Sequence, residues 1–349
     1  MKLFKILSLL LVTSSLFAQD KPKNVIMLIG DGMGLSQIST AFYYKDGPSN
    51  FEQFKNIGFI KTSSASSKVT DSAAGATAFA SGQKTYNGAV GVDADTLSIP
   101  TIVEELEAKN YKTGLISLST ITHATPACYY AHVKSRNMHE EIAEQLANSQ
   151  VDFFAGAGLK FFTDRSDKKN LFEDMKLKGF EMDSVSLSTR VNINKKYGFL
   201  LEEEEMPAKH ISRGDFHPKA TQLALDYLSQ SEDGFFLMTE GSFIDWAGHQ
   251  NNAEMLVAEQ LDFDDVLAVV LDFAKKDKNT LVVVTADHET GGVALTGGET
   301  PDKLKLKFNT KHHTAALIPI FAYGPGSENF QGIYENNEVY HKIKALLEL

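Results

Sequence analysis

Cysteine is almost absent from this sequence, which has 349 residues and a single cysteine, Cys128. A lone cysteine forms no disulfide within the chain, so stability must come from a hydrophobic core, bound metals or a partner subunit. Cys128 lies in an apolar stretch, which favours a packing role over a nucleophilic one. Proline is scarce as well, with 9 residues beside 25 glycines. Collagen-like and low-complexity sequences are therefore excluded.

Positive charge is also in short supply. The chain has 34 lysines and arginines against 45 aspartates and glutamates, which gives a formal net charge of −11. A surface this acidic repels nucleic acids and anionic membranes, and no basic cluster with interleaved aromatics is present, so we expect no nucleic-acid surface. An anionic substrate would need positive charge at its binding site, and bound metal ions are one source of it.

Long hydrophobic runs are missing beyond the first segment, and none there reaches the ~18 residues of a membrane span. The first segment itself predicts a secretory signal peptide over residues 1–18. Lys2 and Lys5 precede an apolar run over residues 6–12, and small residues follow up to Ala18. A buried N-terminal helix is the alternative, but the order of the residues, first charged, then apolar, then small, disfavours it. We therefore expect a periplasmic or secreted protein.

The apolar segments that remain predict an α/β fold with a central, mostly parallel sheet and helices on both faces. Five short runs are nearly continuous in β-branched or aromatic residues, as in buried strands: 25–29, 113–118, 235–239, 281–285 and 317–322. Helical patterns alternate with them over 100–110, with Pro100 in the first turn, 218–230 and 253–276. We expect one domain over residues 19–349, with peripheral insertions at about 160–215 and 297–311.

Carboxylates, imidazoles and hydroxyls gather where these strands end. In open α/β sheets, ligands bind beyond the carboxyl ends of the strands. The residues at those positions are Asp31, His123, Thr125, Glu240, Asp245, His249, Asp287 and His288, and His312 and His313 directly precede the last strand. Asp245 and His249 are four residues apart, so on a helix they share a face, as two ligands of one ion must. Each pair alone fits a solvated face or a helix cap equally well; the whole set is far more specific.

A second unusual segment, residues 69–78, is rich in small residues around Ser72. One interpretation is a tightly packed helix start, capped by Asp71 or Ser72. The other places the Ser72 hydroxyl at a helix N-terminus, where free N–H groups suit a phosphate. A serine hydroxyl is a weak nucleophile by itself, and metal coordination can activate it.

Three motifs together resemble the alkaline phosphatases: residues 69–78, residues 29–34 around Asp31, and residues 285–289 around Asp287 and His288. The resemblance runs from about Asn24 to the C-terminus. It implies the fold of that family, hydrolysis of phosphate monoesters, two zinc ions and one magnesium ion, and a homodimer. Paired metal ions of this kind clamp the attacking and leaving oxygens of an in-line displacement.

The resemblance also assigns roles to individual residues. It implies that Ser72 is the nucleophile that becomes phosphoserine, and that Arg136 binds phosphate with a planar, bidentate guanidinium. It implies three metal sites: one zinc at Asp245, His249 and His313, a second zinc at Asp31, Asp287 and His288, and magnesium at Asp31, Thr125 and Glu240. His313 fits the family pattern better than His312, because the family's zinc-binding histidine directly precedes a threonine, as His313 precedes Thr314.

Two residues expected to bind substrate depart from the best-known bacterial members. His123 stands where those carry aspartate, and Trp246 stands where they carry lysine. Other members of the family carry histidine at one or both positions, so these two differences do not exclude the chain from the family. We expect them to affect its affinity for phosphate and its preference for magnesium. Simple packing is an equally good interpretation of Trp246.

Related enzyme classes fit the sequence less well. A sulfatase needs a Cys/Ser-x-Pro-x-Arg motif, which is missing here, and a phosphoglycerate mutase needs a large inserted domain. A phosphodiesterase of the same superfamily usually has a threonine nucleophile and lacks the third metal site that Thr125 and Glu240 indicate. A non-catalytic, exported metal- or phosphate-binding protein is the alternative from another class, and it gives no reason for Ser72 among the metal ligands.

Overall fold

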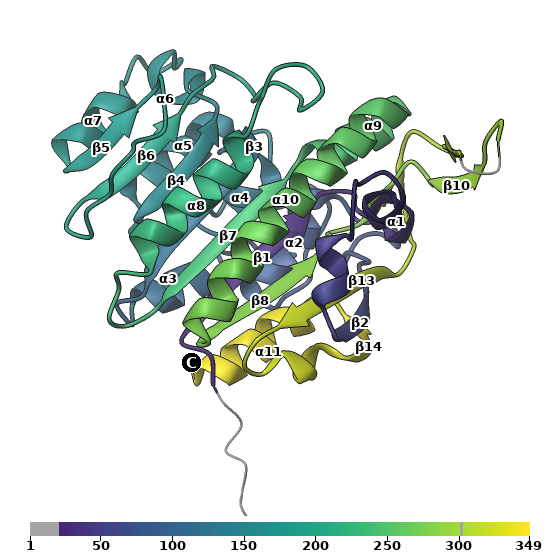
Figure 1. Ribbon diagram of the computed structural model, residues 1–349. Helices are drawn as coiled ribbons and strands as arrows, with labels where there is room; N and C mark the ends of the chain where they lie inside the picture. The colour runs from purple at the N-terminus through teal and green to yellow at the C-terminus, as the bar shows by residue number, and fades with distance from the viewer. Residues whose placement is uncertain (1–20, 301–302) are drawn as a thin grey trace, which may run out of the picture.

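The computed structural model describes residues 21–300 and 303–349, so the predicted signal peptide lies outside the described residues. A ten-stranded sheet runs through the molecule (Figure 1). Its strands, in spatial order, are β14 (Gly332–Glu335), β2 (Asn56–Lys61), β13 (Ile318–Tyr323), β8 (Thr280–Thr285), β1 (Asn24–Gly30), β7 (Phe235–Gly241), β3 (Lys112–Thr120), β4 (Phe153–Ala157), β6 (Lys196–Leu200) and β5 (Phe180–Asp183).

The five predicted apolar runs are confirmed as strands β1, β3, β7, β8 and β13. The neighbours β8, β1, β7 and β3 are parallel and buried, apart from Lys112 at the start of β3, as continuous apolar runs require. Strand β13 is antiparallel to both β8 and β2. The reason is its connection: the chain stays at the carboxyl edge of the sheet after β8, so β13 starts at that edge and runs back.

Helices cover both faces of the sheet. Helices α8 (Phe216–Leu228) and α10 (Ala253–Asp277) lie side by side in front of it in Figure 1, together with α1 (Leu35–Tyr43) and α9 (Phe243–Gln250). Helices α2 (Ser72–Ser81), α3 (Ile102–Glu107), α4 (Ala124–Ala127), α5 (His139–Asn148) and α11 (Glu338–Leu347) lie behind it. Helix α3 begins after Thr101, which caps it together with Glu104, so the expectation that Pro100 lies in its first turn is wrong.

The two segments expected to be insertions differ from one another. Residues 160–215 contain helices α6 (Lys160–Thr163) and α7 (Leu171–Leu177), but they also supply β5 and β6. Because β6 pairs with β4, this segment extends the central sheet to its edge. Around residues 297–311, β10 (Ala294–Gly297) and β11 (Leu304–Lys307) form a two-stranded hairpin outside that sheet. No helix in the described part of the chain is long and apolar enough to cross a membrane.

Candidate active site

The carboxyl ends of four neighbouring strands bring the predicted site residues to one edge of the sheet. Asp31 follows β1, Glu240 lies in β7, and Asp287 follows β8; all three are fully buried. The turn after β1 passes very close to helix α9, since a Cβ on Gly32 would lie 2.7 Å from Cα of Asp245. Gly32 also has a φ of +69°, a conformation that favours glycine. Both features hold Asp31 against the residues of α9.

Asp245, His249 and His313 form a first group of potential metal ligands. Nε2 of His249 lies 3.3 Å from Oδ1 of Asp245 and 3.1 Å from Nε2 of His313. Nε2 of His313 lies 3.5 Å from the same Asp245 oxygen. Three ligand atoms of the types that zinc prefers therefore converge from two segments. His313 reaches the site because β12 (His313–Thr314) pairs with β9 (Glu289–Thr290), whereas His312 is exposed.

Asp31, Asp287 and His288 form a second group. Nε2 of His288 lies 3.2 Å from Oδ2 of Asp287 and 3.4 Å from Oδ1 of Asp31. The Ser72 hydroxyl lies 3.3 Å from the same His288 nitrogen. The structure thus places the predicted nucleophile directly beside a potential metal site.

A third group surrounds the other side of Asp31. Asp31, Glu240 and His123 each offer one atom, and these atoms lie within 4.8 Å of one another. The buried Thr125 hydroxyl contributes to the environment of Glu240, whose second oxygen accepts a 2.6 Å hydrogen bond from Ser117. His123, which the sequence places in the substrate site, therefore lies at the third potential metal site as well.

Unpaired buried atoms in these groups fit bound cations. Five oxygen atoms of these groups have no hydrogen-bond partner among the described residues: both carboxylate oxygens of Asp31, Oδ2 of Asp287, Oε1 of Glu240 and Oγ1 of Thr125. Leaving such groups unpaired is costly in a protein interior. Carboxylate, imidazole and hydroxyl groups are the donors that zinc and magnesium prefer. The residues present therefore fit the metal ions that the sequence predicts.

The electrostatics of these residues support the same view. Burial, followed by the charge of Asp245, raises the pKa of Asp287 to about 7. Burial and the charge of Asp287 raise the pKa of Asp31 well above its usual value. Burial and the nearby His313 hold the pKa of His288 well below its usual value, so its imidazole is neutral, as a metal ligand must be. Nearby positive charge would relieve the cost of ionising these carboxylates.

Asp71 connects the start of helix α2, where Ser72 lies, to Arg136. Asp71 caps helix α2, since its side chain accepts a hydrogen bond from the Ala74 N–H at 3.0 Å. Ser72 is therefore the first residue of the helix, where N–H groups and the helix dipole favour an anion. The Arg136 guanidinium donates to Asp71 at 3.0 Å, and its other terminal nitrogen lies 3.2 Å from Nε2 of His123. The pairing with Asp71 was not predicted from the sequence.

Trp246 lies next to Asp245 on α9 and packs between two side chains. Its indole stacks on Phe243, with ring centroids 4.3 Å apart, and meets the His123 ring edge-on at 6.2 Å. Both interpretations of Trp246 therefore remain compatible with its position. It packs against the core, and it also touches the imidazole that contacts Arg136.

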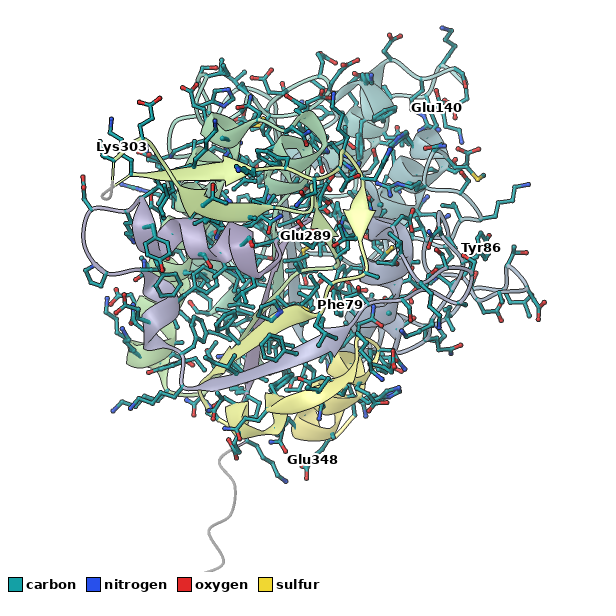
Figure 2. All side chains as sticks on the ribbon, turned by 90° about the vertical axis from the view of Figure 1, so that its right-hand side faces the viewer. Phe79, Tyr86, Glu140, Glu289, Lys303 and Glu348 are labelled. Atoms are coloured by element: carbon teal, nitrogen blue, oxygen red, sulfur yellow. The ribbon has the colours of Figure 1, made fainter. Side chains whose placement is uncertain are left out.

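Sequence reasoning missed Thr290, which lies in β9 between the first two groups. Its hydroxyl donates to the Asp245 carboxylate and lies 3.2 Å from Nδ1 of His288. The neighbouring Glu289, labelled near the centre of Figure 2, is buried and accepts a 2.8 Å hydrogen bond from Gln37. The position two residues after His288 is the one sequence signal for Thr290, because alternate residues of an extended segment share a face.

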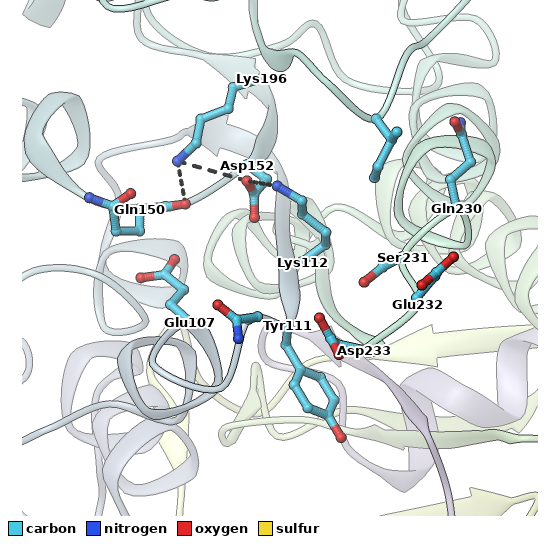
Figure 3. Close-up of a pocket in the computed structure, with 12 residues that line it drawn as sticks. Glu107, Tyr111, Lys112, Gln150, Asp152, Lys196, Gln230, Ser231, Glu232 and Asp233 are labelled. Carbon is cyan, nitrogen blue, oxygen red and sulfur yellow. Dashed lines mark hydrogen bonds and ion pairs between the residues drawn. The ribbon is translucent and has the colours of Figure 1, made fainter.

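A cavity of about 630 Å³ lies at the opposite edge of the sheet, where β3, β6 and β7 begin (Figure 3). Lys112 donates to Asp152 at 2.7 Å, and Lys196 lies 3.8 Å from the same carboxylate. These interactions tie together the starts of neighbouring strands. The cavity contains none of the predicted site residues, so it is separate from the candidate active site.

Comparisons with known proteins find similarity to alkaline phosphatases, the family that the site motifs resemble. The family model for alkaline phosphatase matches residues 22–307 and 300–349. Alkaline phosphatase 3 of Bacillus subtilis is 34% identical over 94% of this chain and 90% of its own length. Alkaline phosphatase of Escherichia coli is 32% identical over 95% of this chain and 87% of its own. The solved structure of alkaline phosphatase from the Antarctic bacterium TAB5 is 50% identical in sequence to this chain and superposes on it with a TM-score of 0.92. The match covers 95% of this chain and 99% of the TAB5 chain. A variant of that enzyme has magnesium bound in a site called M3.

Proposed function

Since the chain belongs to the alkaline phosphatase family and is a phosphate-monoester hydrolase, we propose that Ser72 is its nucleophile and becomes phosphoserine. The observation that carries this proposal is the 3.3 Å separation between the Ser72 hydroxyl and Nε2 of His288. A hydroxyl at that position lies beside a cluster of carboxylates and imidazoles at a helix N-terminus. A phosphoryl group transferred to it would meet the free N–H groups of α2.

We propose that the three groups of ligands hold two zinc ions and one magnesium ion. Asp245, His249 and His313 would hold the first zinc, and Asp31, Asp287 and His288 the second. Asp31, Thr125 and Glu240 would hold magnesium, with His123 close to that site. Divalent ions supply positive charge for phosphoryl transfer and favour ionisation of a nearby hydroxyl. The support is the donor chemistry and the unpaired buried oxygens of Asp31, Asp287 and Glu240.

Arg136 would bind two phosphate oxygens with its planar guanidinium. Its ion pair with Asp71 aims the guanidinium toward the start of α2. Phosphoryl transfer depends mainly on positioning and on charge, and a fixed guanidinium supplies both. His123 and Trp246 would line the phosphate site beside it.

Trapping of the phosphoenzyme tests the role of Ser72. Incubation with inorganic phosphate at mildly acidic pH is expected to label the peptide that contains Ser72, and Ser72→Ala is expected to remove the label. Ser81→Ala is the matched control, because Ser81 is a buried serine of the same helix that donates only to the Thr77 carbonyl. Label on another residue, or full activity of Ser72→Ala beside an active control, contradicts the proposal.

Three further features of the protein belong to this proposal. We infer one α/β domain over residues 19–349, because strands from both halves of the chain alternate in one sheet. We propose removal of residues 1–18 as a signal peptide, with export to the periplasm or the medium. We also propose a homodimer, in keeping with the family resemblance of the sequence.

A further inference from the structure

Arg136 lies in a segment, residues 131–136, that belongs to no helix and to none of the strands described above. Contacts with neighbouring segments must therefore hold it in place. It runs antiparallel to the loop over residues 88–91. Val90 and Val133 exchange two backbone hydrogen bonds, of 3.1 and 2.9 Å, and the Arg136 N–H donates to the Gly88 carbonyl at 2.8 Å. The position of the guanidinium therefore depends on how firmly these two segments are held together.

His132 joins the same two segments at the other end of the 88–91 loop, since it contacts Gly91 whereas Arg136 contacts Gly88. Its Nδ1 lies 2.6 Å from the Gly91 carbonyl oxygen, and its Nε2 lies 2.9 Å from Oε1 of Glu104 at the start of helix α3. Its own backbone N–H donates to the Gln145 side chain of helix α5 at 2.8 Å. One side chain thus connects the Arg136 segment, the 88–91 loop and helix α3.

Both ring nitrogens of His132 act as donors in this geometry. A carbonyl oxygen only accepts, so Nδ1 must carry a proton. The other oxygen of Glu104 accepts from the Thr101 N–H at 2.8 Å, within the capping box of α3. Burial raises the pKa of Glu104, but the hydrogen bonds from His132 and Thr101 hold it below its usual value overall, so the carboxylate is ionised and Nε2 carries a proton as well. His132 is therefore an imidazolium that makes two charge-assisted hydrogen bonds.

The surroundings of the imidazole favour this charged state. Burial lowers the pKa of His132, but the hydrogen bonds to Glu104 and to the Gly91 carbonyl, with the charge of Glu104, raise it above its usual value overall. Other titratable groups near it are Glu107 on α3, Glu144 on α5 and Tyr130 on its own segment, which line one cavity of about 370 Å³ with it. None of them is cationic.

We propose that His132 is a positioning residue for Arg136: the imidazolium locks the 131–136 segment against the 88–91 loop and so holds the guanidinium where it binds phosphate. This inference rests on the proposed role of Arg136. It also gives the lock a pH dependence. Loss of the proton at alkaline pH removes one of the two donors, which loosens the segment and weakens phosphate binding.

Inhibition by inorganic phosphate tests the proposal in four proteins: the wild type, His132→Phe, Arg136→Ala and the double variant. His132→Phe is expected to raise the phosphate Ki on the order of tenfold, which corresponds to a charge-assisted hydrogen bond. In the Arg136→Ala background, the same change is expected to alter Ki less than about twofold, because its effect runs through the guanidinium. The rise of Ki with alkaline pH is expected to be smaller in His132→Phe than in the wild type.

Two controls separate positioning from loss of stability. His341→Phe removes another histidine–carbonyl contact, of 3.2 Å to Gly82, far from the Arg136 segment, and is expected to leave Ki unchanged. Glu104→Gln keeps an oxygen for the Thr101 N–H but loses the charge, and is expected to raise Ki as His132→Phe does. Equal effects of His132→Phe with and without Arg136, or an unchanged Ki in both His132→Phe and Glu104→Gln, overturn the inference. An unchanged Ki in Arg136→Ala alone instead overturns the proposed role of Arg136.

Discussion

The hydroxyl of Thr290 donates a hydrogen bond to the carboxylate of Asp245. Because that hydroxyl has a single proton, its 3.2 Å contact with Nδ1 of His288 must be a hydrogen bond that it accepts from the ring. The proton of the neutral imidazole is then on Nδ1, and the lone pair of Nε2 is free for a metal ion. Thr290 therefore orients one ligand in each of the two proposed zinc sites.

Replacement of Thr290 by valine is expected to weaken metal binding without changing the shape of the site. Loss of such an outer-shell hydrogen bond costs about 10- to 100-fold in metal affinity. The measurement is the rate of zinc loss to a chelator, followed together with activity. Thr221→Val is the control, since Thr221 is also fully buried but lies on α8. Equal rates of zinc loss in the two variants would show that Thr290 plays no such part.

Removal of the metals is expected to abolish activity and to make stability depend on pH. Asp287 has a pKa of about 7 in the folded protein against 3.8 ordinarily, because of burial and then the charge of Asp245. A carboxyl with a raised pKa stabilises the fold below its unfolded pKa and loses that contribution as the pH rises through the folded one. Unfolding of the chelated protein should thus become easier between pH 4 and 7, by about 1.4 kcal/mol per pH unit for each such group.

Thermal unfolding at several pH values checks this expectation. Addition of zinc and magnesium together is expected to restore activity. It is also expected to make stability depend less on pH, because the bound cations replace the protons on the buried carboxyl groups. Asp287→Asn is expected to reduce this pH dependence in the chelated protein. A chelated protein with full activity would contradict the metal dependence altogether.

Much of this site follows from the sequence because the carboxyl ends of parallel strands meet at one edge. Asp31, Glu240 and Asp287 come together for that reason. The periodicity of α9 likewise predicts that Asp245 and His249 share a face, and their 3.3 Å separation agrees. These positions depend only on local structure and on the order of the strands.

The remaining features depend on contacts that no local pattern encodes. His313 reaches the site through the pairing of β12 with β9, and each of these strands has two residues. The Asp71–Arg136 pair joins segments 65 residues apart. Strands β5 and β6 were missed because they are short and their sequences include charged or small residues, so the pairing of β6 with β4 and of β5 with β6 decides their structure.

Asp31 is assigned to two metal sites and Thr125 to one, so their variants should differ. Asp31→Asn is expected to reduce the content of both zinc and magnesium and to lower kcat/KM by several orders of magnitude. Thr125→Val is expected to reduce magnesium alone, with a smaller loss of activity. Elemental analysis of the purified variants measures this, and equal metal loss in both would contradict the assignment.

The pair His123 and Trp246 is expected to set how tightly product phosphate is held. Nε2 of His123 lies 3.2 Å from the Arg136 guanidinium, and the indole of Trp246 meets the His123 ring edge-on. Burial and the charge of Arg136 hold the pKa of His123 well below its usual value, so this imidazole adds no positive charge. Indole offers one N–H donor and no charge. The double variant His123→Asp with Trp246→Lys would instead hold phosphate through charge and bound water.

We expect this double variant to tighten phosphate inhibition on the order of tenfold or more, since a charge-assisted hydrogen bond contributes ~1.5–3 kcal/mol. If product release limits turnover, kcat and KM should both fall. The phosphate Ki and the melting temperature are to be measured on the same samples. Phe243→Leu disturbs the stacking of Trp246 without adding charge and serves as the control. An unchanged Ki with a lower melting temperature would show that Trp246 only packs, because lost packing reduces stability without changing the charge that phosphate meets.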